Sequence, residues 1–418
     1  MNITLKNGQR CGMTSAPSSK SHAQRLLICA GLGASGVTLD CGDISKDIAA
    51  AASCVQTLCA DVTELHEGVL RVEPCAKPSK WVKVLHCGES GSTLRFLIPV
   101  CGALGESVVF KMEGRLSERP LSPLDEVLTE HGMTLERIGT ELHCSGKLTG
   151  GEFEIAGNVS SQFISGLLFA LPLLDTDSTL TVTGKLESSA YIAMTENALR
   201  QSGIEFAKND NVYAIPGNQC YRLNEACTVE GDLSNAAFFL CMGALSDKGV
   251  TVKNIPEHTS QGDKKIIDIL RSFGAEVAVN GDSVAVKKGR LTACTVDASE
   301  IPDLVPVVSV VAAAAEGDTH IINAARVRLK ESDRLMTTAT LLCSLGASVE
   351  ELPDGLIIHG GRPLHGGTID SFNDHRIAMS AAVAACICTE PVTVTGCECV
   401  NKSFPRFWEN FSGLECGQ

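Results

Sequence analysis

Aromatic side chains are scarce in this chain of 418 residues, where they make up 4% of the total. Long apolar runs are also missing, because stretches such as 304–315 stop after about 12 residues, short of the roughly 20 that a membrane-spanning helix needs. The opening residues MNITLKNGQR are polar and contain no apolar core of a signal peptide. We therefore expect a soluble protein of the cytoplasm.

Zinc-type spacing is absent from the 19 cysteines, since no C-x-x-C pair is repeated along the chain. The nearest approaches are Cys386-x-Cys388 and Cys397-x-Cys399, which fit a tetrahedral site poorly. Most cysteines stand in apolar stretches such as LLICAGL and FFLCMGAL. We expect buried, reduced thiols that pack as small hydrophobic residues in a reducing compartment, and no metal site.

Positive charge is in deficit, with 35 Lys and Arg against 49 Asp and Glu and a net charge of −14. This balance argues against a nucleic-acid partner and against a membrane surface, because both are bound through a basic face. An anionic small molecule is still compatible with the composition. It would need a local cluster of cations that opposes the overall sign.

An internal repeat is the strongest positive signal. Six times, an apolar helix-like run is followed by a turn and a short strand rich in β-branched residues. The six strands are centred near Val37, Val108, Leu180, Thr251, His320 and Thr393. Neighbouring centres are 69 to 73 residues apart. Each repeat continues with a second amphipathic segment, such as KKIIDILRSFGA, and two short strands, which predicts an α-β-α-β-β unit.

One such repeat is too small to bury both of its helices and its sheet, so several repeats must pack together. The first helix of each repeat is apolar on nearly every side and is expected to be buried. We therefore predict an α/β protein of two similar lobes, each built from three repeats of about 70 residues, with helices inside and sheets outside. The ligand site is expected in the cleft between the lobes.

Polar and basic residues stand where several of these apolar helices begin. The relevant groups are Lys20 and Arg25 in APSSKSHAQR, Arg95 after a Gly-rich turn, Ser160-Ser161-Gln162, and Asn373-Asp374-His375-Arg376. Helix N-termini present unpaired N–H groups and a partial positive charge, so they suit phosphate or carboxylate. Helix capping is the alternative interpretation. It explains the serines and Asp374 well, and Lys20, Gln162 and Arg376 badly.

Further cations gather in GRLSERPLSP, RVRLKESDRL and VNKSFPRFW. A solvated helix face is an alternative explanation for the second of these stretches. In a chain with a charge of −14, the recurrence of cations at turns favours a ligand that carries several negative charges.

The segments SKSHAQR, GESGSTLRF, SERP, SSQF, IPD, KESDR, NDHR and NKSFPRF occur in an order and spacing that resembles the 5-enolpyruvylshikimate-3-phosphate synthase family. The likeness extends from Lys20 to Arg406. It implies an inside-out fold in which residues 1–19 and 228–418 form lobe 1 and residues 20–227 form lobe 2. It also implies transfer of the carboxyvinyl group of phosphoenolpyruvate to the 5-hydroxyl of shikimate 3-phosphate, with release of phosphate.

The resemblance also implies roles for individual residues. Phosphoenolpyruvate would be bound by Lys20, Gly91, Arg119, Gln162, Arg334, Arg376 and Lys402. Shikimate 3-phosphate would be bound by Lys20, Ser21, Arg25, Ser160, Ser161, Gln162, Ser188, Asp303, Arg326 and Lys330. The catalytic residues would be Asp303, Glu331 and Lys20. No cofactor is implied, and the only expected partners of a monomeric enzyme are its two substrates.

Asp303 would take the proton of the 5-hydroxyl group, and Glu331 would protonate the methylene carbon of phosphoenolpyruvate on the way to a tetrahedral phosphoketal. From its position before an apolar helix, Asp303 also has an alternative interpretation as an N-cap. Two of the departures from the family pattern involve charged residues. Glu89 brings a negative charge near the expected anion pocket, and Arg326 replaces a common asparagine.

Two other functions remain open at this stage. The first is transfer of the same group to UDP-N-acetylglucosamine, against which the chain has Ser21 after Lys20 and Gly114 where the sister family carries a reactive cysteine. The second is a non-catalytic or RNA-end-processing protein on a related scaffold. The net charge of −14 and the presence of both Asp303 and Glu331 argue against it.

Overall fold

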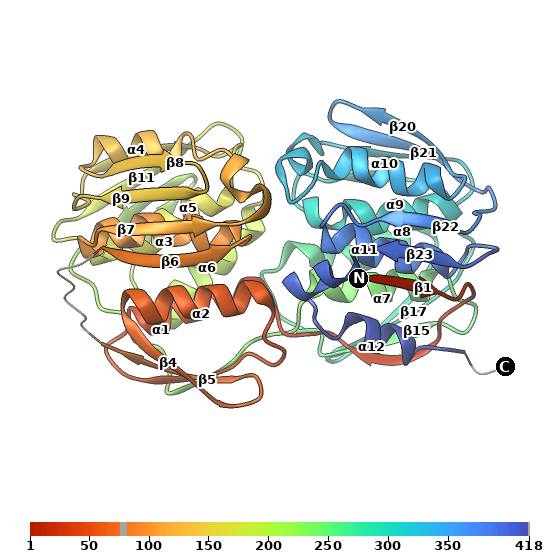
Figure 1. Cartoon of the computed structure of the whole chain (residues 1–418), viewed down its shortest axis with the longest axis horizontal. Coiled ribbons are helices and arrows are strands. Elements are labelled where there is room, and N and C mark those ends of the chain that lie inside the picture. The colour runs from red at the N-terminus through yellow and green to blue at the C-terminus, as the bar shows by residue number, and fades with distance from the viewer. Residues whose placement is uncertain (76–81, 417–418) are drawn as a thin grey trace. The chain divides into compact units, whose positions relative to one another are not determined.

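The computed structural model describes residues 1–75 and 82–416 (Figure 1). The chain divides into two compact units. Unit 1 comprises Met1–Ser18 and Glu230–Gln418, and unit 2 comprises Ser19–Val229. Among the described helices, none combines the length and the apolar character needed to cross a bilayer.

The six predicted repeats are confirmed, and each contains two helices. The first helices are α1 (Lys20–Gly31), α3 (Gly91–Leu104), α5 (Ser161–Ala170), α7 (Leu233–Ala244), α9 (Val305–Ala314) and α11 (His375–Ala385). The second helices are α2 (Lys46–Leu58), α4 (Leu124–Glu130), α6 (Ser189–Gln201), α8 (Ile266–Phe273), α10 (Arg334–Ser344) and α12 (Phe407–Ser412). Short 3-10 turns are η1 (Gly114–Glu118), η2 (Leu171–Leu173), η3 (Gly262–Lys265), η4 (Pro302–Leu304), η5 (Ala325–Leu329) and η6 (Cys397–Lys402).

A predicted strand follows each first helix, and five repeats then add a hairpin. The strands are β3 (Val37–Asp40), β7 (Val108–Met112), β11 (Ser178–Thr183), β15 (Val250–Lys253), β19 (Asp318–Ile322) and β23 (Val392–Thr395). The hairpins are β4 (Ala60–His66) with β5 (Val69–Pro74), β8 (Thr134–Ile138) with β9 (Glu141–Ser145), β12 (Ala207–Asn209) with β13 (Val212–Ile215), β16 (Glu276–Asn280) with β17 (Ser283–Lys287), and β20 (Ser348–Leu352) with β21 (Gly355–His359). In the sixth repeat no hairpin follows β23 within the described residues.

Each repeat also has a short leading strand that the sequence pattern did not predict. These strands are β2 (Gly12–Ser15), β6 (Lys83–Gly88), β10 (Glu152–Ala156), β14 (Ala226–Thr228), β18 (Thr295–Asp297) and β22 (Gly367–Asp370). Each leading strand comes just before a first helix, so the repeat is β-α-β-α-β-β rather than α-β-α-β-β. It pairs in parallel with a strand of the predicted set, as β6 does with β7 and β18 does with β19.

The strands form six small sheets, three in each unit. In the sheet of order β6-β7-β9-β8, the leading strand lies at one edge and the hairpin completes the other side. The sixth sheet has the order β1-β23-β22, in which β1 (Asn2–Leu5) pairs antiparallel with β23 and takes the place of the missing hairpin. The chain passes from one unit to the other after two of the leading strands. β2 pairs with β15 of unit 1, and the chain then continues into α1 of unit 2. β14 pairs with β3 of unit 2, and the chain then continues into α7 of unit 1.

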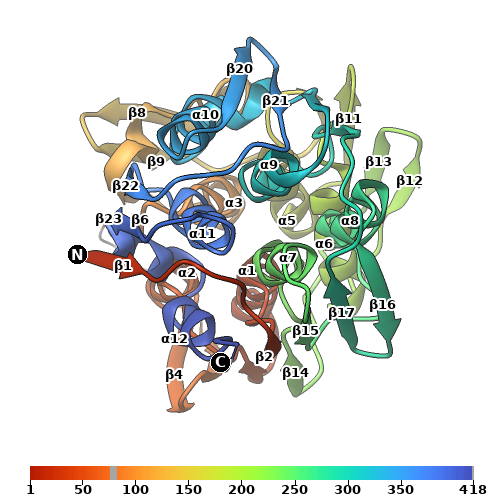
Figure 2. The same ribbon diagram turned by 90° about the vertical axis from the view of Figure 1, so that its right-hand side faces the viewer.

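Each unit has its own hydrophobic core, built around its first helices. In unit 1, α7, α9 and α11 contact one another, and Figure 2 shows them side by side with strands of the three sheets around them. Every residue of α7 and of α11 is buried. In unit 2, α3 packs on α5, and strands β6 and β9 contact α3 (Figure 1). The predicted arrangement of buried helices and outer sheets is therefore confirmed.

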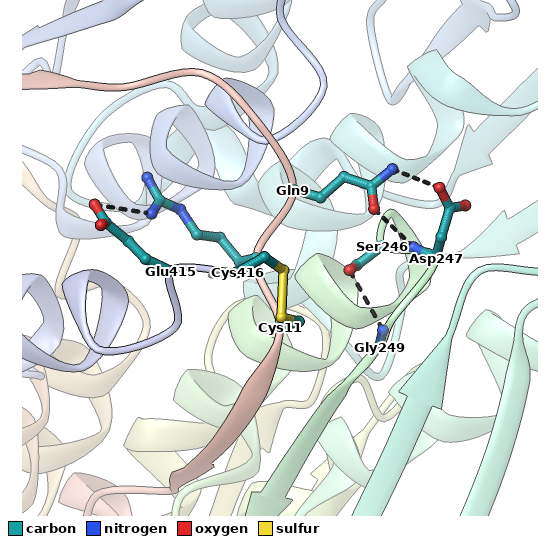
Figure 3. Close-up of a disulfide and its surroundings, with 8 residues drawn as sticks. Gln9, Cys11, Ser246, Asp247, Gly249, Glu415 and Cys416 are labelled. Atoms are coloured by element: carbon teal, nitrogen blue, oxygen red, sulfur yellow. Dashed lines mark hydrogen bonds and ion pairs between the residues drawn. A yellow bond between two sulfur atoms is a disulfide. The ribbon is translucent and has the colours of Figure 1, made fainter. Parts of the chain in front are cut away.

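The cysteines differ from the prediction at one pair. Seventeen are free, and eleven of these are buried, as expected for cysteines that pack as small hydrophobic residues. Cys11 and Cys416, however, form a disulfide across a sequence separation of 405 residues (Figure 3). The surrounding backbone supports this pairing, since Cys11 N donates to Leu414 O at 2.9 Å and Arg10 forms a β-bridge with Glu415. The disulfide thereby joins two segments of unit 1 that are far apart in the sequence.

We predict that Cys416→Ser lowers the free energy of unfolding of unit 1 by about 2–4 kcal/mol, because the disulfide restricts the unfolded chain. Urea denaturation without reductant is the measurement. Dithiothreitol should shift the wild-type midpoint to that of Cys416→Ser and leave the variant unchanged. Cys343→Ser, which replaces an exposed free cysteine, is the control and should unfold like the wild type. A wild-type midpoint that does not respond to reductant would contradict the prediction.

Candidate functional site

Arg334, the first residue of α10, lies at the centre of a charged cluster in unit 1. Its guanidinium donates to three carboxylates: Nη1 to Asp303 Oδ1 at 2.7 Å, Nη2 to Glu331 Oε2 at 2.8 Å, and Nε to Asp374 Oδ2 at 2.8 Å. The arginine side chain is 1% exposed. One buried cation therefore contacts the carboxylates of the predicted catalytic base, Asp303, and of the predicted catalytic acid, Glu331.

Asp303 also pairs with two other predicted site residues. Its Oδ2 lies 3.1 Å from Arg376 Nη2, and its Oδ1 lies 3.5 Å from Lys330 Nζ. The N-cap interpretation of Asp303 is wrong, because neither η4 nor α9 has a side-chain cap. The carboxylate instead faces three cations, each of which was predicted to bind an anionic substrate.

Asp374, the N-cap residue of α11, is the third carboxylate that contacts Arg334. It caps the helix by accepting from Arg376 N at 2.9 Å, and it also accepts from Ser332 Oγ at 2.9 Å. Burial acts to raise the pKa of Asp374, but the charge and hydrogen bond of Arg334, together with the charge of His375, make the net shift downward. The predicted cap is thus confirmed, and Asp374 in addition fixes the guanidinium that holds Asp303 and Glu331.

Lys402 and Arg326 are bonded to backbone carbonyl groups of unit 1. Lys402 Nζ donates to Asn373 O at 2.6 Å, next to Asp374. Arg326 Nη2 donates to Ser299 O at 3.0 Å.

Asp263, which the sequence did not single out, is buried and accepts a hydrogen bond from Ser234 Oγ. Burial and the charge of Asp303 raise the pKa of Asp263 to about 6, although Arg376 opposes the shift.

In unit 2, the start of α1 carries Lys20, Ser21 and Arg25. Ser19 caps the helix by accepting from His22 N at 3.3 Å, as the capping interpretation predicts. Lys20 Nζ lies 3.0 Å from Asp47 Oδ2, at the start of α2. Asp47 was not predicted, because an acidic residue in the first turn of a helix is common without any ligand.

Arg25 is a buried cation whose hydrogen-bond partners are all neutral. Nε donates to Thr195 Oγ1 at 2.8 Å, Nη1 to Ser21 O at 2.7 Å, and Nη2 to Tyr191 O at 2.8 Å. Burial lowers the pKa of Arg25 to about 10. Ser188 is close in the chain to Tyr191, whose N–H donates to Ser188 O at 3.1 Å.

Gly91 and Arg119 lie against each other, although 27 residues separate them in the sequence. A Cβ atom added to Gly91 would be 2.8 Å from Arg119 Nη1 and 3.1 Å from Arg119 Cζ. Gly91 is the first residue of α3, so the guanidinium lies over the start of that helix. Arg119 Nε is buried and has no hydrogen-bond partner in the part of the chain that the structure describes. A cation over a helix N-terminus makes a locally positive site that suits an anion.

Arg95 joins this region to the start of α5. Its Nη1 donates to Gln162 Oε1 at 2.7 Å, and its Nη2 donates to Pro120 O at 3.1 Å, next to Arg119. Ser160 caps α5 by accepting from Gln162 N at 3.3 Å, and Ser161 is the first residue of the helix. Gln162 is therefore oriented by a buried arginine, which capping alone would not have required.

The predicted site residues thus form two sets. Unit 1 contains the set Asp303, Arg326, Lys330, Glu331, Arg334, Arg376 and Lys402, in which cations and carboxylates are closely paired. Unit 2 contains the set Lys20, Ser21, Arg25, Gly91, Arg119, Ser160, Ser161, Gln162 and Ser188, in which Arg25 and Arg119 have no ion pair with a carboxylate of the described chain. Within residues 1–75 and 82–416, no group of three His, Cys, Asp or Glu side chains is arranged to hold a metal ion.

Comparison with known proteins gives matches along nearly the whole chain. Residues 8–411 match the family model described as EPSP synthase (3-phosphoshikimate 1-carboxyvinyltransferase). A 3-phosphoshikimate 1-carboxyvinyltransferase of Clostridium kluyveri is 41% identical over 408 residues, covering 96% of this chain and 95% of that protein. Its counterpart in Clostridium acetobutylicum is 43% identical over 404 residues, covering 95% of this chain and 94% of that protein.

The fold is also similar to that of solved structures. The EPSP synthase from Acinetobacter baumannii superposes with a TM-score of 0.81 and covers 100% of both chains, at 23% sequence identity. The enolpyruvyl transferase NikO from Streptomyces tendae superposes with a TM-score of 0.78 at 17% identity, covering 98% of this chain and 96% of that one. These two likenesses concern the architecture.

The Arg334 cluster generates a prediction about stability. Asp374→Asn should lower the free energy of unfolding by about 3–5 kcal/mol, because asparagine preserves the helix cap but leaves a buried guanidinium with one fewer counter-charge. Asp333→Asn is the matched control. Asp333 also caps a helix and pairs with an arginine, Arg328, but its side chain is 30% exposed, so the cost should be at most about 1 kcal/mol.

The same pair of variants gives a pH test. Since the pKa of Asp374 is lowered on folding, its contribution is present above the unfolded-state value of about 4 and is lost as the pH falls through the folded-state value. The stability difference between the wild type and Asp374→Asn, measured by urea denaturation, should therefore shrink in acid. Equal losses for Asp374→Asn and Asp333→Asn at pH 7 would contradict the importance of burial.

Proposed function

Because the chain belongs to the EPSP synthase (3-phosphoshikimate 1-carboxyvinyltransferase) family, we propose how its residues divide the work of that family's reaction. The chain is a transferase of the shikimate pathway, which leads to the aromatic amino acids. It moves the carboxyvinyl group of phosphoenolpyruvate to shikimate 3-phosphate and releases phosphate. Both substrates are anionic small molecules, which accounts for cations clustered in a chain with a net charge of −14.

We assign phosphoenolpyruvate to seven residues, five of which are cations. Arg119 and Gly91 would bind it at the start of α3, where the arginine Nε has no hydrogen-bond partner among the described residues. Lys20 and Gln162 would contribute from α1 and α5, and Arg334, Arg376 and Lys402 from unit 1. Guanidinium groups suit this ligand because they bind phosphate and carboxylate through paired hydrogen bonds.

We assign shikimate 3-phosphate chiefly to groups around α1, α5 and α6. Arg25 supports this assignment, since a buried guanidinium with only neutral partners is a favourable place for a phosphate. The remaining residues of the proposed set are Lys20, Ser21, Ser160, Ser161, Gln162, Ser188, Asp303, Arg326 and Lys330. Hydroxyl and amide side chains in this set suit the ring hydroxyls of the acceptor.

The observation that carries the proposal is the attachment of Asp303 and Glu331 to the same buried guanidinium. Arg334 Nη1 and Nη2 contact one carboxylate each, so an acid and a base are held at a fixed separation. Arg376 and Lys330 bring two further positive charges to Asp303. This arrangement suits a reaction in which one group donates a proton, another accepts one, and both substrates are anions.

The proposed chemistry has two halves. Glu331 donates a proton to the methylene carbon of phosphoenolpyruvate while Asp303 takes the proton of the 5-hydroxyl group, whose oxygen bonds to the adjacent carbon. The product of this half is a tetrahedral phosphoketal. In the second half, a proton leaves the new methyl group, the bond to the phosphate oxygen breaks, and the double bond of the enol ether forms. The acid and the base exchange roles between the halves, and Lys20 neutralises charge on the departing phosphate.

Transfer to UDP-N-acetylglucosamine is not favoured, because the matched family model and the similar proteins concern shikimate 3-phosphate as acceptor. We further propose that the enzyme is a monomer, since each unit completes its own core. We place it in the cytoplasm, since seventeen of its cysteines are free thiols, as is usual in a reducing compartment. The disulfide between Cys11 and Cys416 is the exception.

We predict that the purified protein releases phosphate from phosphoenolpyruvate with shikimate 3-phosphate and not with UDP-N-acetylglucosamine. Replacing Lys20 or Arg376 by alanine should abolish most of this turnover, because losing one cation that binds a phosphate costs about 2–5 kcal/mol. Circular dichroism should show that both variants stay folded. Release with the nucleotide sugar alone, or near-normal turnover in either variant, would refute the assignment.

A second prediction concerns the contact between Gly91 and Arg119. Gly91→Ala should raise the KM for phosphoenolpyruvate roughly tenfold, since its methyl group would displace the Arg119 guanidinium and a tenfold loss corresponds to about 1.4 kcal/mol. The KM for shikimate 3-phosphate should change by less than about twofold, on the same free-energy scale. Gly413→Ala is the control, because an added Cβ there meets no atom closer than 3.6 Å. Equal changes in both KM values would argue against a specific role for the contact.

A further inference from the structure

Gln24 is a buried amide that connects the starts of three helices in unit 2. It lies in the second turn of α1 and is 0% exposed. Its Nε2 donates to Asp47 O at 3.2 Å, to Ser90 Oγ at 3.0 Å and to Thr93 Oγ1 at 3.1 Å. Its Oε1 accepts from Ser92 Oγ at 2.6 Å. One side chain of α1 is therefore bonded to the first turn of α2 and to the first turn of α3.

The orientation of this amide is determined by its partners. The backbone carbonyl of Asp47 can only accept a hydrogen bond, so the NH2 group must face it and Oε1 must face the Ser92 hydroxyl. The amide has two N–H groups for three acceptors, and Ser90 Oγ and Thr93 Oγ1, 2.8 Å apart, share one of them. A buried network of this kind is costly to rearrange, because each broken bond leaves an unpaired polar group.

The segments that Gln24 connects carry proposed ligands of phosphoenolpyruvate. Lys20 lies one turn before Gln24, and its Nζ pairs with the side chain of Asp47, whose backbone carbonyl accepts from Gln24. On the other side, Ser90 and Ser92 flank Gly91, over which the Arg119 guanidinium lies. The amide thus sets the distance between the helix start that presents Lys20 and the helix start that presents Gly91 to Arg119.

We propose that Gln24 is a positioning residue for phosphoenolpyruvate, acting through the relative placement of Lys20 and the start of α3. The inference rests on the proposed function, because it takes Lys20, Gly91 and Arg119 as ligands of that substrate. Gln24 touches no substrate itself. Its buried hydrogen bonds fix the position of Lys20 relative to the start of α3. Small displacements of such groups weaken binding and turnover strongly.

The test is a kinetic comparison of Gln24→Met with Gln219→Met, with both KM values measured by phosphate release. Methionine keeps most of the side-chain volume and removes the hydrogen bonds. Gln219 is the control in the same unit, because its amide bonds to the Glu205 N–H and to the carbonyls of Glu205 and Pro216, none of which belongs to α1, α2 or α3. We expect Gln24→Met to raise the KM for phosphoenolpyruvate at least about tenfold. The KM for shikimate 3-phosphate should rise less, because Lys20 is assigned to both substrates but Gly91 and Arg119 to phosphoenolpyruvate alone. Gln219→Met should change neither constant.

Thr93→Val keeps the test decisive if Gln24→Met does not fold. It preserves the shape of the side chain and removes only the hydroxyl that contacts Gln24 and Ser90. The expected result is the same selective rise in the KM for phosphoenolpyruvate, at smaller size. A purely structural role would lower the unfolding midpoint and leave the ratio of the two KM values unchanged, and that result in either variant overturns the proposal.

The wild-type enzyme separates the two hypotheses. If it releases phosphate with shikimate 3-phosphate, the proposed function stands and the variants decide the role of Gln24. If the wild type binds neither substrate, as measured by calorimetry with each compound alone and with both together, the proposed function fails first and the inference fails with it. A folded Gln24→Met enzyme with an unchanged KM for phosphoenolpyruvate would overturn the positioning role alone.

Discussion

The first helix of each repeat is apolar on nearly every side, and the need to bury it governs the rest of the structure. A single repeat cannot enclose such a helix, so three repeats assemble and place α7, α9 and α11 in mutual contact within unit 1. The flanks of these helices are consequently unavailable to solvent. The charged side chains of the first helices lie in their first two turns, as Lys20, Arg25 and Arg376 do.

The two units use their helix starts differently. In unit 1, Arg334, Arg376 and Lys330 are neutralised by carboxylates, chiefly Asp303, so each positive charge has a partner before any ligand is considered. In unit 2, Arg25 is bonded to a hydroxyl and two carbonyls, and Arg119 has a buried Nε that no residue of 1–75 or 82–416 contacts by a hydrogen bond. Burying guanidinium groups without a carboxylate costs free energy, and an anionic substrate would recover it. Unit 1 therefore holds the proposed acid and base together with cations that are already paired, whereas unit 2 presents two guanidinium groups that lack a carboxylate partner among the described residues.

Much of this organisation could be predicted from the sequence. The repeat of about 70 residues is visible because apolar helices and β-branched strands recur at regular intervals. Leading strands β6 and β10, of six and five residues, were overlooked although they are as long as the predicted strands, whereas the shortest ones give little signal. β14, for example, has three residues and no alternation of apolar and polar side chains. The N-cap interpretation of Asp303 was wrong because its position in the sequence cannot reveal that Arg334, 31 residues away, donates a hydrogen bond to its carboxylate. Gln24 and the partner of Cys11 were missed for the same reason, since their contacts are set by packing between distant segments.

The two units also differ in how their chain segments are arranged, with a consequence for biosynthesis. Unit 2 is one uninterrupted segment, so all of its parts are present once Val229 has left the ribosome. Unit 1 cannot be completed at that point. Its strands β1 and β2 are made first, but their partners β23 and β15 are made much later. During translation the amino-terminal strands must remain unpaired while the middle of the chain acquires its structure, and such open edges are where nascent chains are most prone to aggregate.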